Sequence, residues 1–240
     1  MGTSLRPEGS RVLVVGAGGL GCPVALALAH AGVALTIVDD DVVELSNLQR
    51  QVLYVTERVG SAKTASARAG LCALVPGADV AVVQARLDAR NWAELVAGHA
   101  VVVDGTDAIE TKFLLGDLAV AAHVPLVHGG VLRFDGHVLV VVPGGPCFRC
   151  LFEAPPDDEA PTCADAGVLG AMCGWVGGRM AARVLDVLAG HGDQHAGRLT
   201  VLDGLRDCER DVVFRARADC PACSPRWPAA SSRLETRSAP

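Results

Sequence analysis

Short apolar runs alternate with helix-like segments along the first two-thirds of this chain. The runs are continuous and rich in valine, as in strands buried on both faces of a sheet. They lie at residues 11–15, 34–38, 80–84, 100–104 and 126–131. The segments between them have the spacing of helices, at residues 20–31, 61–75 (with Ser61 as N-cap), 91–97 and 108–122. The alternation predicts an α/β fold, a Rossmann-like, mostly parallel sheet with helices on both faces.

The pattern changes after His128. Three shorter runs, at residues 136–142, 199–203 and 211–215, predict an antiparallel C-terminal extension. A polar loop rich in Pro, Asp and Glu precedes an apolar helix at residues 168–188. We therefore expect a single domain over residues 1–226, with a mobile crossover loop at 151–166 and a disordered tail at 227–240.

Composition narrows the class of protein. The chain has 240 residues, 50% of them hydrophobic and 4% aromatic, so its core must rest on aliphatic side chains. A net charge of −6 disfavours binding to nucleic acid or to an anionic membrane. The polar first ten residues lack a secretory h-region, and residues 24–38 are too interrupted to span a membrane. A cytoplasmic protein is expected, in which nine cysteines are unlikely to form a disulfide framework.

A glycine loop follows the first apolar run. Such a loop lets a phosphate approach the backbone and the N-terminus of the next helix, although a ligand-free tight turn remains an alternative. Asp39 ends the second strand, where a carboxylate usually holds ribose hydroxyls. Asp40 and Asp41 are either part of this site or solvated loop charges. The loop glycines are Gly16, Gly18, Gly19 and Gly21.

Polar residues that suit a charged triphosphate follow the acidic cluster. Arg50 offers a planar fork and Lys63 a point charge, with Asn47 and Gln51 beside them. Asp107 follows another strand whose C-terminal end points to the same crevice, so its carboxylate can hold Mg²⁺ between phosphate oxygens. Asp107 can alternatively, or additionally, cap the helix that starts at Ala108.

Four of the nine cysteines form two Cys-x-x-Cys pairs. Two such pairs can close a four-sulfur zinc site that is structural, although unrelated buried or redox cysteines would share this spacing. Cys163 lies in the acidic loop before the apolar helix and is either a reactive thiol or an inert one. The remaining cysteines are expected to be packing residues. The paired cysteines are Cys147, Cys150, Cys220 and Cys223, and the packing cysteines are Cys22, Cys72, Cys173 and Cys208.

In combination these motifs resemble the ubiquitin-activating-type adenylyltransferases of sulfur-carrier pathways (the ThiF/MoeB/HesA-like family), over residues 11–223. The resemblance implies an enzyme, a homodimer in that family, that uses ATP and Mg²⁺ to adenylate the C-terminal Gly-Gly carboxylate of a small ubiquitin-fold carrier. It implies that Asp39 binds ribose, that Asp107 binds magnesium, and that Cys163 matches a cysteine that some members join covalently to the carrier. A sulfurtransferase is a further possible partner. The implied phosphate-binding residues are Asn47, Arg50, Gln51 and Lys63.

Three positions depart from the family pattern. The family has an arginine-containing helix before its first strand, whereas here ten residues precede Arg11 and Arg6 is the arginine among them. Ala108 stands where asparagine is common, and Lys112 where arginine is common. Two other functions therefore stay open: a catalytically degenerate partner module of such an enzyme, and a nicotinamide- or flavin-dependent oxidoreductase that uses the same glycine loop.

Overall fold

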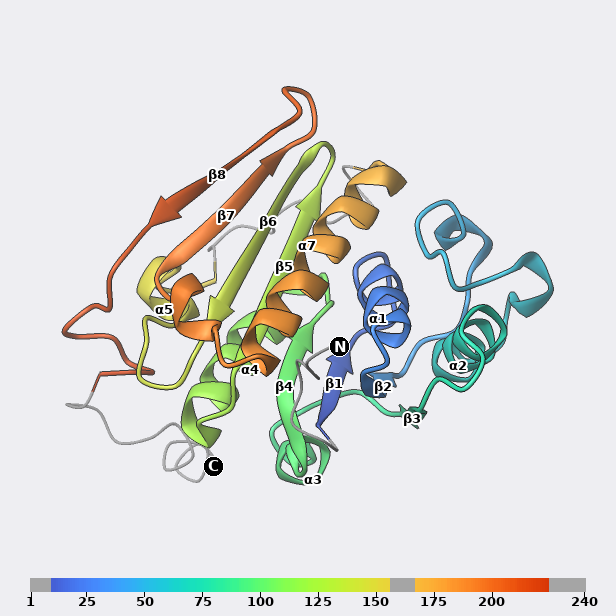
Figure 1. Cartoon of the computed structure of the whole chain (residues 1–240), viewed down its shortest axis with the longest axis horizontal. Coiled ribbons are helices and arrows are strands. Elements are labelled where there is room, and N and C mark those ends of the chain that lie inside the picture. Colours follow the sequence, from blue (N-terminus) through green and yellow to red (C-terminus); the bar gives the residue numbers. More distant parts are fainter. Residues whose placement is uncertain (1–9, 156–166, 225–240) are drawn as a thin grey trace, which may run out of the picture.

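The computed structural model describes residues 10–155 and 167–224, which build one eight-stranded sheet in the order β3-β2-β1-β4-β5-β6-β7-β8 (Figure 1). The order reverses direction between β1 and β4, which is the crevice-forming switch point of open α/β sheets. The strands are β1 (Arg11–Val15), β2 (Ala34–Asp39), β3 (Val80–Gln84), β4 (His99–Asp104), β5 (Leu126–Leu132), β6 (Asp135–Val141), β7 (Arg198–Asp203) and β8 (Cys208–Val213).

The sheet is parallel from β3 to β5 and antiparallel from β5 to β8. Strand β5 belongs to both parts, since Val102 pairs with Leu126 in parallel while Leu126 pairs with Val141 in antiparallel register. The predicted α/β class, with its antiparallel extension, is confirmed.

Helices cover both faces of the sheet. Along β1, Val12 and Val14 pack into one core cluster with α1, α2 and α7, whereas Leu13 and Val15 pack into a second cluster with α3, α4 and α5. Such alternation is the period-two signature of a strand buried on both sides. The helices are α1 (Gly21–His30), α2 (Lys63–Leu74), α3 (Trp92–Val96), α4 (Ile109–Ala122), α5 (Phe148–Leu151) and α7 (Gly170–Leu188), with 3₁₀ turns at Leu45–Asn47, Thr56–Arg58 and Gly192–His195.

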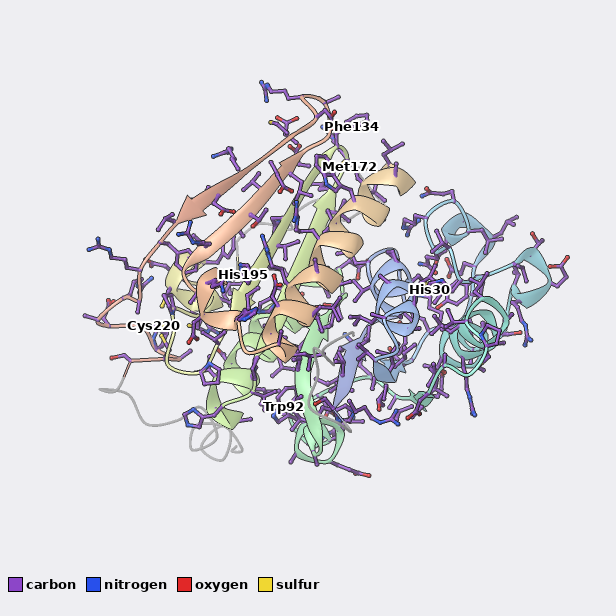
Figure 2. The ribbon with its side chains drawn as sticks, viewed as in Figure 1. His30, Trp92, Phe134, Met172, His195 and Cys220 are labelled. Atoms are coloured by element: carbon purple, nitrogen blue, oxygen red, sulfur yellow. The ribbon has the colours of Figure 1, made fainter. Side chains whose placement is uncertain are left out.

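The two ends of the strands differ in what surrounds them. Figure 2 shows Phe134, in the β5–β6 turn, close to Met172, in the first turn of α7, while Trp92 of α3 lies at the other end of the sheet. The carboxyl ends of the parallel strands therefore face the start of α7, and α3 sits beneath their amino ends. In the described part of the chain, no helix combines the length and apolar character that a bilayer crossing requires.

Two details of the sequence interpretation are wrong. The last strand begins at Cys208 rather than at residue 211, because the carboxylate of Asp203 accepts the backbone N–H groups of Leu205 and Arg206 (3.1 and 2.9 Å) and closes a tight turn. Helix α2 begins at Lys63 with Ala62 as its N-cap, and no side chain caps it, so Ser61 does not have the expected role. The tail at 227–240 and most of the 151–166 loop lie outside the described residues.

Candidate functional site

A pocket of about 660 Å³ opens at the carboxyl ends of the strands. Ten of the residues singled out in the sequence line it. Gly21 is not among them, and Cys163 lies outside the described residues. The structure therefore gathers positions spread over ninety residues of chain into one cavity. The lining residues are Gly16, Gly18, Gly19, Asp39, Asp41, Asn47, Arg50, Gln51, Lys63 and Asp107.

The glycine loop is held against β4 and against Asp39. Gly16 has φ +89°, and a Cβ there would lie 3.0 Å from the carbonyl group of Gly105. A Cβ on Gly21 would lie 1.9 Å from the carbonyl oxygen of Gly16, so Gly21 permits close packing of helix on loop and does not face the pocket. The backbone N–H of Ala17 donates to Asp39 Oδ2 at 2.7 Å. The acid at the end of β2 thus fixes the loop that follows β1.

The segment after β2 carries the basic and amide side chains. Gln51 Nε2 donates to Asn47 Oδ1 at 3.1 Å, which ties the two amides together across one turn. Arg50 is half-buried, and its guanidinium lies 3.4 Å from the carbonyl of Ser46, so most of its donors stay available for a ligand. Lys63 starts α2 and pairs with Asp41 at 2.8 Å.

Asp107 is exposed at the pocket rim and does not cap α4. The N-cap position is Ala108, without a side-chain hydrogen bond. The turn that carries Asp107 is held instead by Asp104, whose Oδ1 accepts both the backbone N–H (3.0 Å) and the hydroxyl (2.6 Å) of Thr106. The capping role considered for Asp107 is therefore wrong, and its side chain is exposed and lines the pocket.

A buried cluster beneath this turn was missed in the sequence. Asp104 is fully buried, and its Oδ2 accepts from Lys112 Nζ at 3.2 Å and from His128 Nδ1 at 2.8 Å. Lys112 Nζ also donates to the carbonyl of Gly129 at 2.6 Å and lines the pocket. A polar residue at the end of a buried strand was a signal for Asp104. Lys112 was noted only as a departure from the family pattern, and nothing in the local pattern indicated His128 or the contacts among the three residues.

The charges in this cluster can be assigned. Burial alone would raise the pKa of Asp104, but the Lys112 ammonium and the hydrogen bonds from His128 and Thr106 hold it well below its usual range. Burial lowers the pKa of His128, so its ring is neutral at pH 7. Because Asp104 is ionised, Nδ1 of His128 carries the proton, and the buried Nε2 is a lone-pair acceptor without a partner among the described residues.

A second histidine, His137 on β6, lines the pocket beside this cluster. Its ring packs over Gly130, where a Cβ would lie 2.1 Å from the ring. Burial and the positive charge of Lys112 lower the pKa of His137 to about 4. The pocket wall near Lys112 therefore carries an uncharged imidazole at neutral pH.

The four paired cysteines meet around α5, in the second core cluster, which also holds Leu139 and Val141 of β6. Their sulfur atoms all lie within 4.8 Å of one another, at 3.9 Å for Cys147–Cys150, 3.5 Å for Cys147–Cys220 and 3.4 Å for Cys150–Cys223. Tetrahedral zinc with bonds of about 2.3 Å places sulfurs roughly 3.8 Å apart, so the set fits that ion. Burial and the neighbouring sulfurs raise the pKa of the Cys147 thiol, a cost that a divalent cation would remove. Figure 2 shows Cys220 near the β7–β8 edge of the sheet, at the left, whereas His30 of α1 lies to the right.

Phe148 joins the cysteine cluster to the buried polar cluster. It stands between Cys147 and Cys150, and its ring centroid lies 4.6 Å from that of His128 and 5.0 Å from that of Phe113. It also lines the pocket. Two of the other cysteines do not pack as expected: Cys22 and Cys173 are buried, but Cys72 and Cys208 are exposed.

A parallel sheet whose pocket holds a glycine loop, a strand-end acid and basic side chains is typical of nucleotide-binding α/β proteins. The comparisons specify the class further. The model of the ThiF family matches residues 5–222, and the chain belongs to this family.

Named relatives share much of the sequence. The chain is 46% identical over 225 residues to the SAMP-activating enzyme E1 of Haloferax volcanii (90% of this chain, 83% of the relative). It is 44% identical over 226 residues to the sulfur carrier protein adenylyltransferase of Thermus thermophilus (91% and 83%). Against the mouse adenylyltransferase and sulfurtransferase MOCS3 it is 46% identical over 224 residues, and it spans 48% of that protein.

Solved structures share the fold. A crystal structure of E. coli MccB with MccA superposes with a TM-score of 0.78 at 18% identity, covering 90% of this chain and 67% of that one. At this identity the likeness concerns the arrangement of the elements.

Proposed function

We propose that this protein uses ATP to adenylate the C-terminal Gly-Gly carboxylate of a small ubiquitin-like sulfur-carrier protein, activating it for thiocarboxylate formation. The observation that carries the proposal is one pocket in which the glycine loop, Asp39, Arg50, Lys63 and Asp107 meet. The names of the relatives from Haloferax and Thermus agree with it, since both describe enzymes of this kind.

The pocket residues that were expected from the sequence each have a part in this proposal. The glycine loop lets the phosphates approach the backbone N–H groups. Asp39, which already accepts a hydrogen bond from the backbone N–H of Ala17, also accepts hydrogen bonds from the ribose hydroxyls. Arg50 and Lys63 neutralise the phosphates, while Asn47 and Gln51 add neutral hydrogen bonds. Asp41 partners Lys63 until the nucleotide arrives.

The reaction is a displacement at the α-phosphorus. A carboxylate oxygen of the carrier forms a bond to phosphorus, the bond between the α-phosphorus and its bridging oxygen breaks, and pyrophosphate leaves with that electron pair. The nucleophile is already ionised at neutral pH, so no general base is required. The protein contributes by positioning both reactants and cancelling negative charge.

Two metals complete the proposal. Asp107 is exposed at the pocket rim and offers carboxylate oxygens, the ligands that Mg²⁺ prefers. Bound Mg²⁺ would neutralise phosphate charge during the reaction. We assign Zn²⁺ to Cys147, Cys150, Cys220 and Cys223, where four protein ligands make it a structural ion. It would tie the segment after β8 to the start of α5.

The remaining assignments follow the family. We propose that the protein works in the cytoplasm as a homodimer, that residues 1–226 form one adenylyltransferase domain, and that a sulfurtransferase can take part in the pathway. Cys163 is the candidate for a covalent bond to the carrier. The oxidoreductase alternative has lost its support, because membership of the ThiF family accounts for the glycine loop. The degenerate-module alternative predicts little magnesium-dependent ATP binding.

Pyrophosphate–ATP exchange tests the proposal. The wild-type protein should exchange label when, and only when, a Gly-Gly-terminated carrier from the same genome is present. Asp107→Ala and Arg50→Ala should each abolish exchange and keep the thermal midpoint, because neither side chain holds the core together. Wild-type exchange in either variant would remove that residue from the mechanism, and no exchange by the wild type with any such carrier would overturn the proposed function.

A further inference from the structure

The pocket extends beyond the part assigned to the nucleotide. Past Asp107 its wall continues along three strands of the antiparallel part, with mostly apolar side chains. We call this stretch the tail arm. Its residues are Gly130, Val131, Leu132, Asp135, Gly136 and His137 of the β5–β6 hairpin, with Leu199 and Val201 of β7. An extended, mostly apolar arm beside a phosphate site is suited to a chain end rather than to a second nucleotide.

Lys112 lies where the tail arm meets the nucleotide end of the pocket. It reaches from α4 to Asp104 at the carboxyl end of β4 and to the carbonyl of Gly129 in the middle of β5. Asp107 precedes α4 on one side of this point, and Gly130 opens the tail arm on the other. Arg50 lies in the segment between β2 and α2 and Lys63 is the first residue of α2, and both line the part of the pocket that we assign to the nucleotide.

The ammonium of Lys112 is held in place before any ligand binds. Its side chain is 7% exposed, and two of its three N–H donors have acceptors at 3.2 and 2.6 Å among the described residues. Asp104 does not depend on Lys112 alone, because the N–H and hydroxyl of Thr106 and the ring of His128 also donate to it. The third N–H donor of Lys112 therefore has no acceptor among the described residues, and Lys112 lines the pocket.

We propose that Lys112 binds the terminal carboxylate of the carrier, and that Asp104 and His128 are positioning residues that hold its ammonium at the mouth of the tail arm. This inference rests on the proposed function and names the contact that selects an acid over a neutral chain end. A lysine fixed by two acceptors directs its remaining donor without loss of side-chain entropy.

The test compares two forms of one ligand. A Gly-Gly-terminated carrier from the same genome is prepared with a free carboxylate and with a C-terminal amide. Their affinities are measured by calorimetry with α,β-methylene-ATP at saturation, so that no turnover occurs. The wild type should bind the carboxylate form about tenfold more tightly than the amide, as expected for one charge-assisted hydrogen bond. The Lys112→Met variant should show a ratio of less than about twofold.

The other lysine of the chain, Lys63, supplies the matched control. The sequence contains two lysines, and Lys63→Met should weaken binding of the ATP analogue while the carboxylate-to-amide ratio stays at about tenfold. If Lys112→Met does not fold, Lys112→Gln, whose amide can donate to the same acceptors, replaces it with the same expectation. A wild-type ratio of one, or a ratio unchanged in either Lys112 variant, overturns the inference.

The outcomes separate this inference from the proposed function. A wild-type protein that prefers the carboxylate carrier but does not exchange pyrophosphate would contradict the proposed function and leave the role of Lys112 intact. A wild-type protein that exchanges, together with a Lys112→Met variant that keeps the preference, would contradict the Lys112 contact and leave the proposed function intact.

Discussion

Lys63 Nζ lies 2.8 Å from Asp41 Oδ2 at the nucleotide end of the pocket. The pair is asymmetric, because the lysine side chain is 9% exposed and the aspartate side chain 66% exposed. Exposed ion pairs contribute little to stability, so the aspartate can leave at small cost when a phosphate arrives. The lysine stays where the start of α2 holds it. The pair thus keeps a buried cation neutralised and available.

The first prediction concerns this lysine. Lys63→Met should weaken ATP binding at least about tenfold, since one charge-assisted contact to phosphate is lost. Calorimetry with ATP and magnesium, without carrier, measures the effect. Lys112→Met is the matched control for removing a buried lysine and should bind ATP as the wild type does. Equal losses in the two variants would contradict the division of labour between the lysines.

A second prediction separates packing from binding within the glycine loop. Gly21→Ala should lower the free energy of unfolding by about 3 kcal/mol or more, because the new methyl group would meet the carbonyl of Gly16 at 1.9 Å. Gly18→Ala should keep wild-type stability, since the nearest atom, Gln51 Nε2, lies 3.8 Å away. Its methyl group would instead enter the pocket and weaken ATP binding. Denaturant titration and calorimetry test both, and a stable Gly21→Ala protein would refute the packing role.

The third prediction concerns the cysteine cluster. Freshly purified protein should contain one zinc ion per chain by elemental analysis. Cys220→Ser should lose the metal and lower the thermal midpoint by about 10 °C or more, because a structural zinc contributes on the order of 10 kcal/mol and each kcal/mol shifts the midpoint by about 2–4 °C. The exposed Cys72→Ser should change neither quantity. Metal-free wild-type protein of normal stability would reject the site.

Acid should destabilise the fold through His128 and His137. Burial first, and then the charge of Lys112, lowers the pKa of His137 from 6.5 to about 4. Between these values the unfolded chain binds a proton that the folded chain does not, so the free energy of unfolding falls as the pH drops from 6.5 to 4. The lowered pKa of His128 acts in the same direction. The lowered pKa of Asp104 adds a loss below about pH 4, where the unfolded carboxylate takes up its proton.

His137→Gln measures the share of that side chain. The slope of unfolding free energy against pH should decrease between pH 6.5 and 4, by at most about 1.4 kcal/mol per pH unit, the value for one proton. Urea titrations at fixed pH values give the slope. The same slope in wild type and variant would show that the fold does not lower the pKa of His137.

Some parts of the site could be predicted because their signals are local. The glycine loop and Asp39 belong to one strand–turn–helix–strand unit, and the cysteine pairs are recognisable by spacing although Cys147 and Cys220 are 73 residues apart. The strand pattern was equally readable, because buried parallel strands are continuous apolar runs.

The buried polar cluster could not be predicted, because its members meet only through the fold. Lys112 lies eight residues from Asp104 along the chain and His128 twenty-four, and lysine on a helix is ordinarily solvated. The start of β8 was misplaced for a related reason. Charged residues hide its alternation, and its first residue is set by the turn that Asp203 closes.

Intact-mass spectrometry of the carrier tests the central claim most directly. Wild-type protein, ATP, magnesium and a Gly-Gly-terminated carrier from the same genome are mixed with pyrophosphatase, which removes the second product. We predict that the carrier mass increases by one adenylyl group. The increase should be absent with Asp107→Ala and absent for the carrier whose terminus is an amide. An unmodified carrier, under conditions in which the wild-type protein binds both ATP and carrier, would contradict it.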